Sequence, residues 1–133
     1  MKNYNILVLF LLFLGLSCND SEEPTFNFEE MEAEYTILQE ERLAIEALAI
    51  AEVCVDESSC DYVAFGSKPC GGPWTYLAYN SNIDVDAFLQ RVEIYNNNEE
   101  SFNLKWGIAS DCSTPAPPNN VECIDGVCTA VYN

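Results

Sequence analysis

The residues of this chain best suited to chemistry are its seven cysteines, and the chain contains no histidine. Without histidine, the Ser–His and Cys–His pairs that activate nucleophiles are excluded, and so are zinc sites with imidazole ligands. Six cysteines lie in the body of the chain and can pair completely, whereas Cys18 stands apart, directly after an apolar run. Carboxylate chemistry is what remains for an enzyme, and so small a chain leaves little room for a two-carboxylate cleft. We therefore expect no enzymatic activity and no cofactor.

The six paired cysteines predict a disulfide framework in an exported protein, where an oxidising compartment preserves such bonds. They are Cys54, Cys60, Cys70, Cys112, Cys123 and Cys128. Spacing does not fix the connectivity in general. One pair has a local argument, because Asp125-Gly126 is a preferred type I′ hairpin turn and places Cys123 opposite Cys128 within reach of a disulfide. Zinc held by four of the thiolates is the alternative, and the lack of a CxxC pair disfavours it.

Cys18 is predicted to carry a lipid. Residues 6–16 are wholly apolar but shorter than the roughly 20 residues that a transmembrane helix needs, so residues 1–17 are typical of a signal peptide. The sequence Leu14-Gly-Leu-Ser-Cys18 resembles a bacterial lipobox, from which Gly15 departs. This resemblance implies an envelope protein held in the outer membrane by acyl chains on Cys18. The alternative is an ordinary signal peptide that is cleaved nearby.

The charge of the chain limits its partners. There are 22 acidic residues and five basic ones, which gives a formal net charge of −17. Such a surface repels nucleic-acid phosphates, so we exclude a nucleic-acid partner and expect a protein or cell-surface partner. Residues 18–28 form an acidic tether, whose first residues resemble a lipoprotein surface-export signal. Residues 29–133 are long enough for a single domain.

The elements that must position these groups follow from periodicity. Apolar residues at helical spacing predict a helix over 40–53 that could start as early as Met31, and a second helix from Asp84 to just before Gly107. The run Asn96-Asn-Asn98 predicts a weak point or a bend in the second helix. We expect strands over 61–65, 74–79 and 108–112, and a hairpin over 121–132. The order predicts an α+β fold, a small disulfide-stabilised antiparallel sheet with two helices packed on one face.

The loop from Gly66 to Trp74 is the strongest candidate for recognition. Its glycines and prolines preclude regular structure, and Cys70 would hold it rigid, which lowers the cost of ordering on binding. An exposed Lys68 on such a loop could serve as the substrate-like side chain of a protease inhibitor, although Pro69 directly after it disfavours this. The alternative is a tight connection between two strands, with Trp74 in the core. The candidate contact residues are Lys68, Pro69, Gly71, Gly72, Pro73 and Trp74, with the proline-rich loop 113–118.

A weak metal candidate lies at the start of the second helix. Asn82, Asp84, Asp86 and Glu93 have the ligand spacing of a calcium-binding EF-hand loop. However, Ala87 occupies the position that requires glycine. The alternative, which we favour, is that Asp84 caps the helix and its acidic neighbours stabilise the first turn.

The block Phe65-Gly-Ser-Lys-Pro-Cys-Gly-Gly-Pro-Trp-Thr-Tyr-Leu-Ala-Tyr79, followed by Ser110-Asp-Cys112 and Cys123-Ile-Asp-Gly-Val-Cys128, resembles a family of small exported bacterial proteins, many of them Bacteroidota-type envelope lipoproteins. The resemblance spans Cys54 to Cys128. It implies an exported domain and assigns no catalytic residue. We therefore expect a non-enzymatic binding module, with protease inhibition and weak calcium binding as alternatives.

Overall fold

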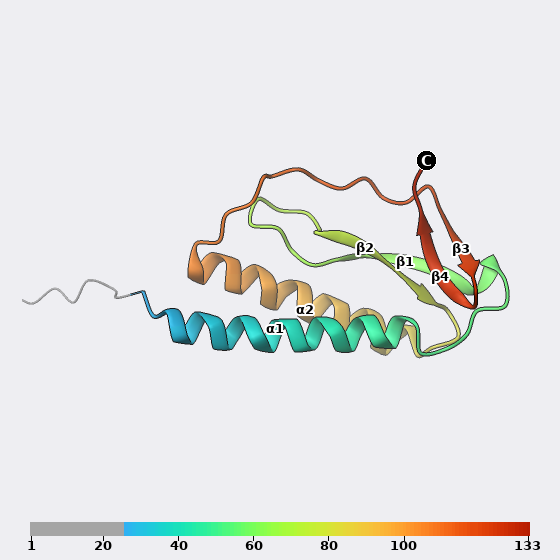
Figure 1. Ribbon diagram of the computed structural model, residues 1–133, viewed down its shortest axis with the longest axis horizontal. Helices are drawn as coiled ribbons and strands as arrows, with labels where there is room; N and C mark the ends of the chain where they lie inside the picture. Colours follow the sequence, from blue (N-terminus) through green and yellow to red (C-terminus); the bar gives the residue numbers. More distant parts are fainter. Residues whose placement is uncertain (1–25) are drawn as a thin grey trace, which may run out of the picture.

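The computed structural model describes residues 26–133, which form two helices and two β-hairpins (Figure 1). Helices α1 (Phe28–Ala49) and α2 (Val85–Trp106) lie side by side as an antiparallel pair. Strands β1 (Cys60–Phe65) and β2 (Thr75–Asn80) lie against this pair, and β3 (Asn120–Ile124) and β4 (Val127–Val131) lie at the end where α1 finishes. A short 3₁₀ turn, η1 (Glu57–Ser59), leads into β1. The predicted α+β class is confirmed.

The helix boundaries follow from local capping. The Asn27 side chain accepts a hydrogen bond from the Glu30 N–H (3.2 Å), so α1 begins earlier than Met31, and it ends at Ala49, before Val53. At α2, Asp84 Oδ1 accepts from the Ala87 N–H (3.1 Å), and Gly107 ends the helix with a left-handed φ of 62°. These caps supply partners for backbone groups that a helix end leaves unpaired.

The run Asn96-Asn-Asn98 does not interrupt α2, which continues as helix through these residues. Asn96 instead uses its amide to hold the end of β1. Its Nδ2 donates to the Ala64 carbonyl (3.2 Å), and its Oδ1 accepts from the Gly66 N–H (2.7 Å). The poor helix propensity of asparagine is therefore offset by tertiary hydrogen bonds.

The sheet is divided into two separate antiparallel pairs, β1–β2 and β3–β4. Within the described chain, residues 108–112 form no strand but belong to an extended segment that leads from α2 to β3. The 121–132 hairpin is confirmed, with positive φ at both Asp125 and Gly126, as a type I′ turn requires. The core lies between the helices and the β1–β2 hairpin, around the fully buried Ile45, Phe65 and Tyr95.

Residues 26–133 contain three disulfides, and the predicted Cys123–Cys128 bond is not among them. Those two residues do face each other across β3–β4. However, Cys54 and Cys60 approach the same hairpin, and the sulfur atoms of Cys54, Cys60 and Cys128 lie within 4.8 Å of one another. The bonds are Cys54–Cys123 and Cys60–Cys128, which fix the hairpin to the segment after α1 and to β1, and Cys70–Cys112, which joins two loops.

Candidate functional site

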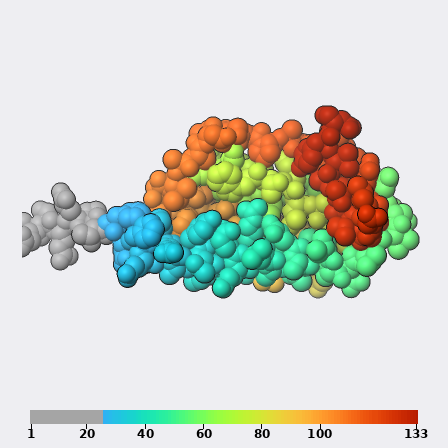
Figure 2. Space-filling model, viewed as in Figure 1, coloured from blue at the N-terminus to red at the C-terminus, as the bar shows by residue number. Residues whose placement is uncertain are grey.

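An open groove lies between the N-terminal half of α1, the C-terminal half of α2 and the loop that joins β1 to β2. Its volume is about 530 Å³, within the range of small-molecule sites. Figure 2 shows α1 on one side of the yellow-green hairpin residues and the orange segment after α2 on the other. The groove is mainly apolar, and its lining residues are Phe28, Met31, Glu32, Tyr35, Leu38, Gln39, Arg42, Trp74, Glu99, Phe102, Asn103 and Ile108.

The groove exists because the helices are longer than the hairpin that covers them. A helix of 22 residues is about 33 Å long, whereas a strand of six residues spans about 20 Å. The β1–β2 hairpin therefore leaves the N-terminal part of α1 without a strand above it. Apolar residues continue there at helical spacing, and the side chains of Phe28 and Tyr35 are 60% and 50% exposed. The uncovered apolar surface is the outer wall of the groove.

The inner end of the groove contains a pair of opposite charges, Arg42 and Glu99. The Arg42 guanidinium lies 5.4 Å from the centre of the Phe65 ring, and its Nε donates to Glu46 (3.0 Å). Glu99 accepts hydrogen bonds from the Ser67 N–H (2.6 Å) and the Tyr95 hydroxyl (3.3 Å). Burial raises the pKa of Glu99 above its ordinary value, although both hydrogen bonds and the charge of Arg42 oppose the rise.

The loop beside the groove is held by a row of polar side chains on α2. Asn96, Glu99 and Asn103 lie on one face of the helix and bind the backbone of Gly66 and Ser67, with Asn103 Nδ2 donating to the Ser67 carbonyl (2.7 Å). Gly66 has a φ of 80°, and an added Cβ would lie 2.7 Å from the Trp74 ring and 2.9 Å from Glu99. Only glycine fits this close approach. The missing side chain lets the Trp74 ring pack against Gly66, where it lines the groove.

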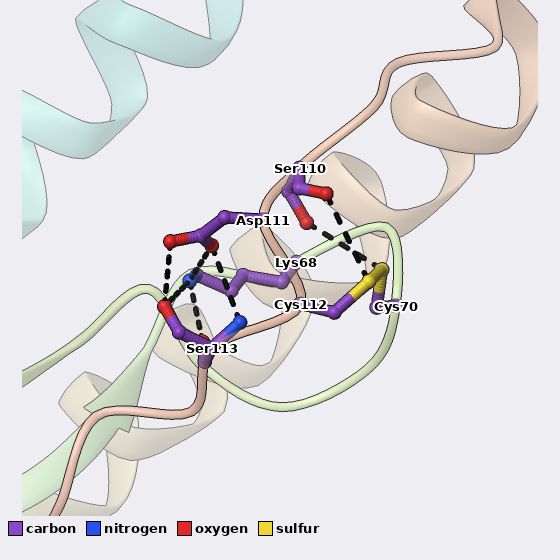
Figure 3. Close-up of polar contacts among 6 residues, drawn as sticks. All are labelled: Lys68, Cys70, Ser110, Asp111, Cys112 and Ser113. Atoms are coloured by element: carbon purple, nitrogen blue, oxygen red, sulfur yellow. Dashed lines mark hydrogen bonds and ion pairs between the residues drawn. A yellow bond between two sulfur atoms is a disulfide. The ribbon is translucent and has the colours of Figure 1, made fainter.

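Lys68 does not present its side chain to solvent, contrary to the expectation for the recognition loop. It is 7% exposed, and its ammonium group donates to Asp111 (2.8 Å) and to the Ser113 carbonyl and hydroxyl (2.5 and 3.2 Å), as Figure 3 shows. The same ammonium lies 4.9 Å from the centre of the Trp74 ring. The buried Lys68 side chain links the β1–β2 loop to the segment after α2. It cannot enter the specificity pocket of a protease without breaking these hydrogen bonds.

The other candidates of the recognition loop divide between two environments. Gly71 and Gly72 are exposed, and the Lys68 N–H donates to the Gly72 carbonyl (2.9 Å) in a tight turn. Pro69 and Pro73 are half-buried. Trp74 is half-buried too and lines the groove, so it belongs neither to the core nor to an exposed tip. The proline-rich segment 113–118 is not part of the groove lining.

The calcium candidates do not converge on one point. Asp84 uses its side chain to cap α2, and Asp86 and Glu93 are exposed on that helix. Glu93 lies seven positions after Asp86 in the helix, which places the two residues about 10 Å apart along the helix axis. Asn82 precedes the helix, and its backbone N–H is bound by the Asn80 side chain (2.8 Å). A calcium loop needs these side chains to converge around one ion.

Within residues 26–133, one group of potential metal ligands comes together, the sulfur atoms of Cys54, Cys60 and Cys128. All three are in disulfides, and a sulfur atom in a disulfide is not the thiolate that zinc requires. We assign this cluster a structural role.

The groove residues on α1 were not among the predicted site residues. Phe28 was placed in the tether, and the first predicted helix was assigned no binding role. A sequence signal did exist, because Phe28, Met31, Tyr35, Leu38 and Arg42 recur at the i, i+3 and i+4 spacing of one helix face. That pattern shows a shared face, but only the position of the hairpin reveals which part of the face stays uncovered.

Comparisons of the chain with protein-family models, curated proteins and solved structures found no match. The family resemblance, the lipobox and the envelope location therefore remain predictions. Cys18, the signal peptide and the tether up to residue 25 lie outside the described residues. Within 26–133, neither helix combines the length and apolar character needed to cross a bilayer.

Proposed function

We propose that this protein is a non-enzymatic binding module of the bacterial envelope, tethered through Cys18, which takes an apolar ligand in the groove between α1 and α2. The groove is the observation that carries the proposal. It combines apolar walls with a small number of inward polar groups, which is the usual composition of ligand sites. Its floor is fixed by hydrogen bonds from α2 to the loop, so little ordering is needed on binding.

The two alternatives from the sequence receive less support. A protease inhibitor needs an accessible side chain on its rigid loop, and Lys68 is buried against Asp111 and Ser113. A calcium module needs converging carboxylates, and Asp84 is already used as a helix cap. Neither alternative uses the groove.

The experiment is a titration of the mature chain, residues 18–133 with Cys18→Ser, with the neutral fluorescent probe N-phenyl-1-naphthylamine. We expect saturable binding to one site. Met31→Trp places a large ring in the groove and should weaken binding at least about tenfold, because the indole occupies space that the probe would otherwise fill. Leu43→Trp is the matched control, since Leu43 is exposed on α1 outside the groove.

Equal effects of the two tryptophan variants would contradict the proposal, as would a lack of saturable binding by the folded protein. Circular dichroism and thermal unfolding establish that each variant is folded before it is titrated.

A further inference from the structure

The polar groups at the inner end of the groove differ in how many hydrogen-bonding atoms they leave free for a ligand. Both oxygens of the Glu99 carboxylate already accept hydrogen bonds, from Ser67 and Tyr95. Within residues 26–133, the Arg42 Nε donates to Glu46 in an ion pair, and the guanidinium lies near the Tyr95 hydroxyl, where it opposes the rise in the pKa of that group. Its terminal amino groups make no full hydrogen bond to these residues and keep N–H donors. The Trp74 indole N–H has no partner among the described residues either, although its ring contacts the Lys68 ammonium. The inner end therefore still offers N–H donors to an acceptor on a ligand.

The apolar part of the groove has a direction. Arg42 and Phe28 lie fourteen residues apart on α1, which corresponds to about 21 Å along the helix axis. Met31, Tyr35 and Leu38 line the wall between them, and Phe102 of α2 lies opposite. A ligand that matches this arrangement has a polar head at one end and a flexible apolar chain that runs toward the start of α1.

We infer that the groove binds a single-chain amphiphile with a carboxylate head, a free fatty acid, with the head at Arg42 and the chain along α1 toward Phe28. The inference rests on the proposed binding function and names its ligand class. A guanidinium pairs with a carboxylate in a bidentate geometry that suits its two terminal amino groups. Each buried CH₂ of the chain adds to the affinity through the hydrophobic effect.

The net charge of −17 repels an anionic ligand, so the dependence of affinity on salt concentration provides a test. Long-range repulsion from exposed carboxylates is screened by salt, whereas a partly buried pair at Arg42 is screened less. The affinity for a fatty acid should therefore rise as ionic strength increases from a low value. A cationic amphiphile should show the opposite dependence.

The test is displacement of N-phenyl-1-naphthylamine from the Cys18→Ser mature chain by three ligands with the same chain, used below their micelle concentrations. These are dodecanoate, dodecanol and dodecyltrimethylammonium. We expect dodecanoate to bind at least about tenfold more tightly than the other two, as a hydrogen-bonded charge pair provides. Tighter binding of the cation, or equal binding of dodecanol, would overturn the inference while leaving the proposed apolar binding function intact.

Two arginine variants locate the head group. Arg42→Gln should lose the preference for dodecanoate over dodecanol while still binding dodecanol, which also shows that its groove is intact. Arg91→Gln is the matched control, because Arg91 pairs with Glu41 between the helices and does not line the groove. Loss of the preference in Arg91→Gln but not in Arg42→Gln would overturn the assignment of the head-group site.

The acyl chains on Cys18 are an alternative occupant of the groove. Comparing the acylated protein with Cys18→Ser distinguishes them from a free fatty acid. If the acyl chains on Cys18 filled the groove, the acylated mature protein would bind no dodecanoate while Cys18→Ser bound it well. That outcome would overturn a free fatty acid as the ligand. We expect the two forms to bind dodecanoate equally, since the anchor's acyl chains are buried in the membrane or detergent.

Discussion

The two ends of this molecule are stabilised in different ways. At the β3–β4 end, two disulfides close loops of 69 and 68 residues and fix the hairpin to the rest of the fold. At the groove end, the helices extend past the β1–β2 hairpin, and the flanking loop is held by side-chain hydrogen bonds, by Lys68 and by one disulfide between exposed cysteines. The comparison indicates that covalent bonds at one end provide stability while apolar helix surface at the other stays accessible.

The largest expected effect comes from removing a disulfide at the β3–β4 end. Cys60→Ala with Cys128→Ala should lower the free energy of unfolding by about 3 kcal/mol, because Cys54–Cys123 still closes the long loop and the unfolded chain is released only from a short second loop. Urea denaturation measures the change. Cys70→Ala with Cys112→Ala is the counterpart, and it should weaken probe binding more than the first pair does. A larger loss of probe binding in the Cys60/Cys128 variant than in the Cys70/Cys112 variant would contradict the different roles assigned to the two ends.

Lys68 provides the next largest effect, at the groove end. Lys68→Met should destabilise the protein by about 2 kcal/mol, because it removes charge-assisted hydrogen bonds to Asp111 and the Ser113 carbonyl, although water can solvate these exposed partners. Chemical denaturation measures the loss. Lys105→Met is the control, since Lys105 makes two ion pairs but on the surface, where such pairs contribute little. A larger loss for the surface lysine would contradict the structural role of Lys68.

Two carboxyl groups at the groove end should give opposite pH dependences of stability. Lys68 and the Ser113 groups lower the pKa of Asp111 from 3.8 to about 2, so its contribution is present above about pH 4 and is lost as the pH falls toward 2. Burial raises the pKa of Glu99, so stability falls as the pH rises from 4.5 through that raised value.

Measuring the free energy of unfolding as a function of pH, in the wild type and in two variants, distinguishes the contributions of Asp111 and Glu99. Asp111→Asn should flatten the acid limb alone, and Glu99→Gln should remove the decline above pH 4.5 while keeping an oxygen to accept from Ser67. A Glu99→Gln protein that is less stable than the wild type at neutral pH would contradict the cost of burying this carboxylate.

The smallest predicted effect tests the cap of α2. Asp84→Ala should cost about 1 kcal/mol, because the Ala87 N–H loses its acceptor. Thermal unfolding with and without millimolar Ca²⁺ should show the same shift in both conditions. A calcium-dependent rise in the melting temperature of wild type that disappears in Asp84→Ala would instead restore the calcium hypothesis.

Local features of the chain could be predicted from the sequence because they depend on nearby residues. The Asp125-Gly126 turn, the β1–β2 hairpin and the capping role of Asp84 depend on turn, strand and cap propensities. The α+β class followed from the order of these elements. The register that places Cys123 opposite Cys128 was also correct.

The errors involve contacts between distant segments. Asn96 would weaken an isolated helix, but hydrogen bonds to residues about 30 positions away hold it in place. Lys68 was expected at the surface because it lies on a glycine- and proline-rich loop, but its partners lie more than 40 residues further along the chain. Cys123 and Cys128 bond to Cys54 and Cys60 because the fold brings these onto the same hairpin. The groove likewise depends on where the hairpin stops over the helices.

The central claim is that the groove binds a ligand, and amide chemical-shift mapping of the ¹⁵N-labelled Cys18→Ser mature chain tests it most directly. Titration with N-phenyl-1-naphthylamine should shift the amides of Met31, Leu38, Trp74 and Phe102 and leave those of β3 and β4 unchanged. Saturable shifts confined to the groove would support the account. Shifts centred on the β3–β4 end, or spread evenly over the protein, would contradict it.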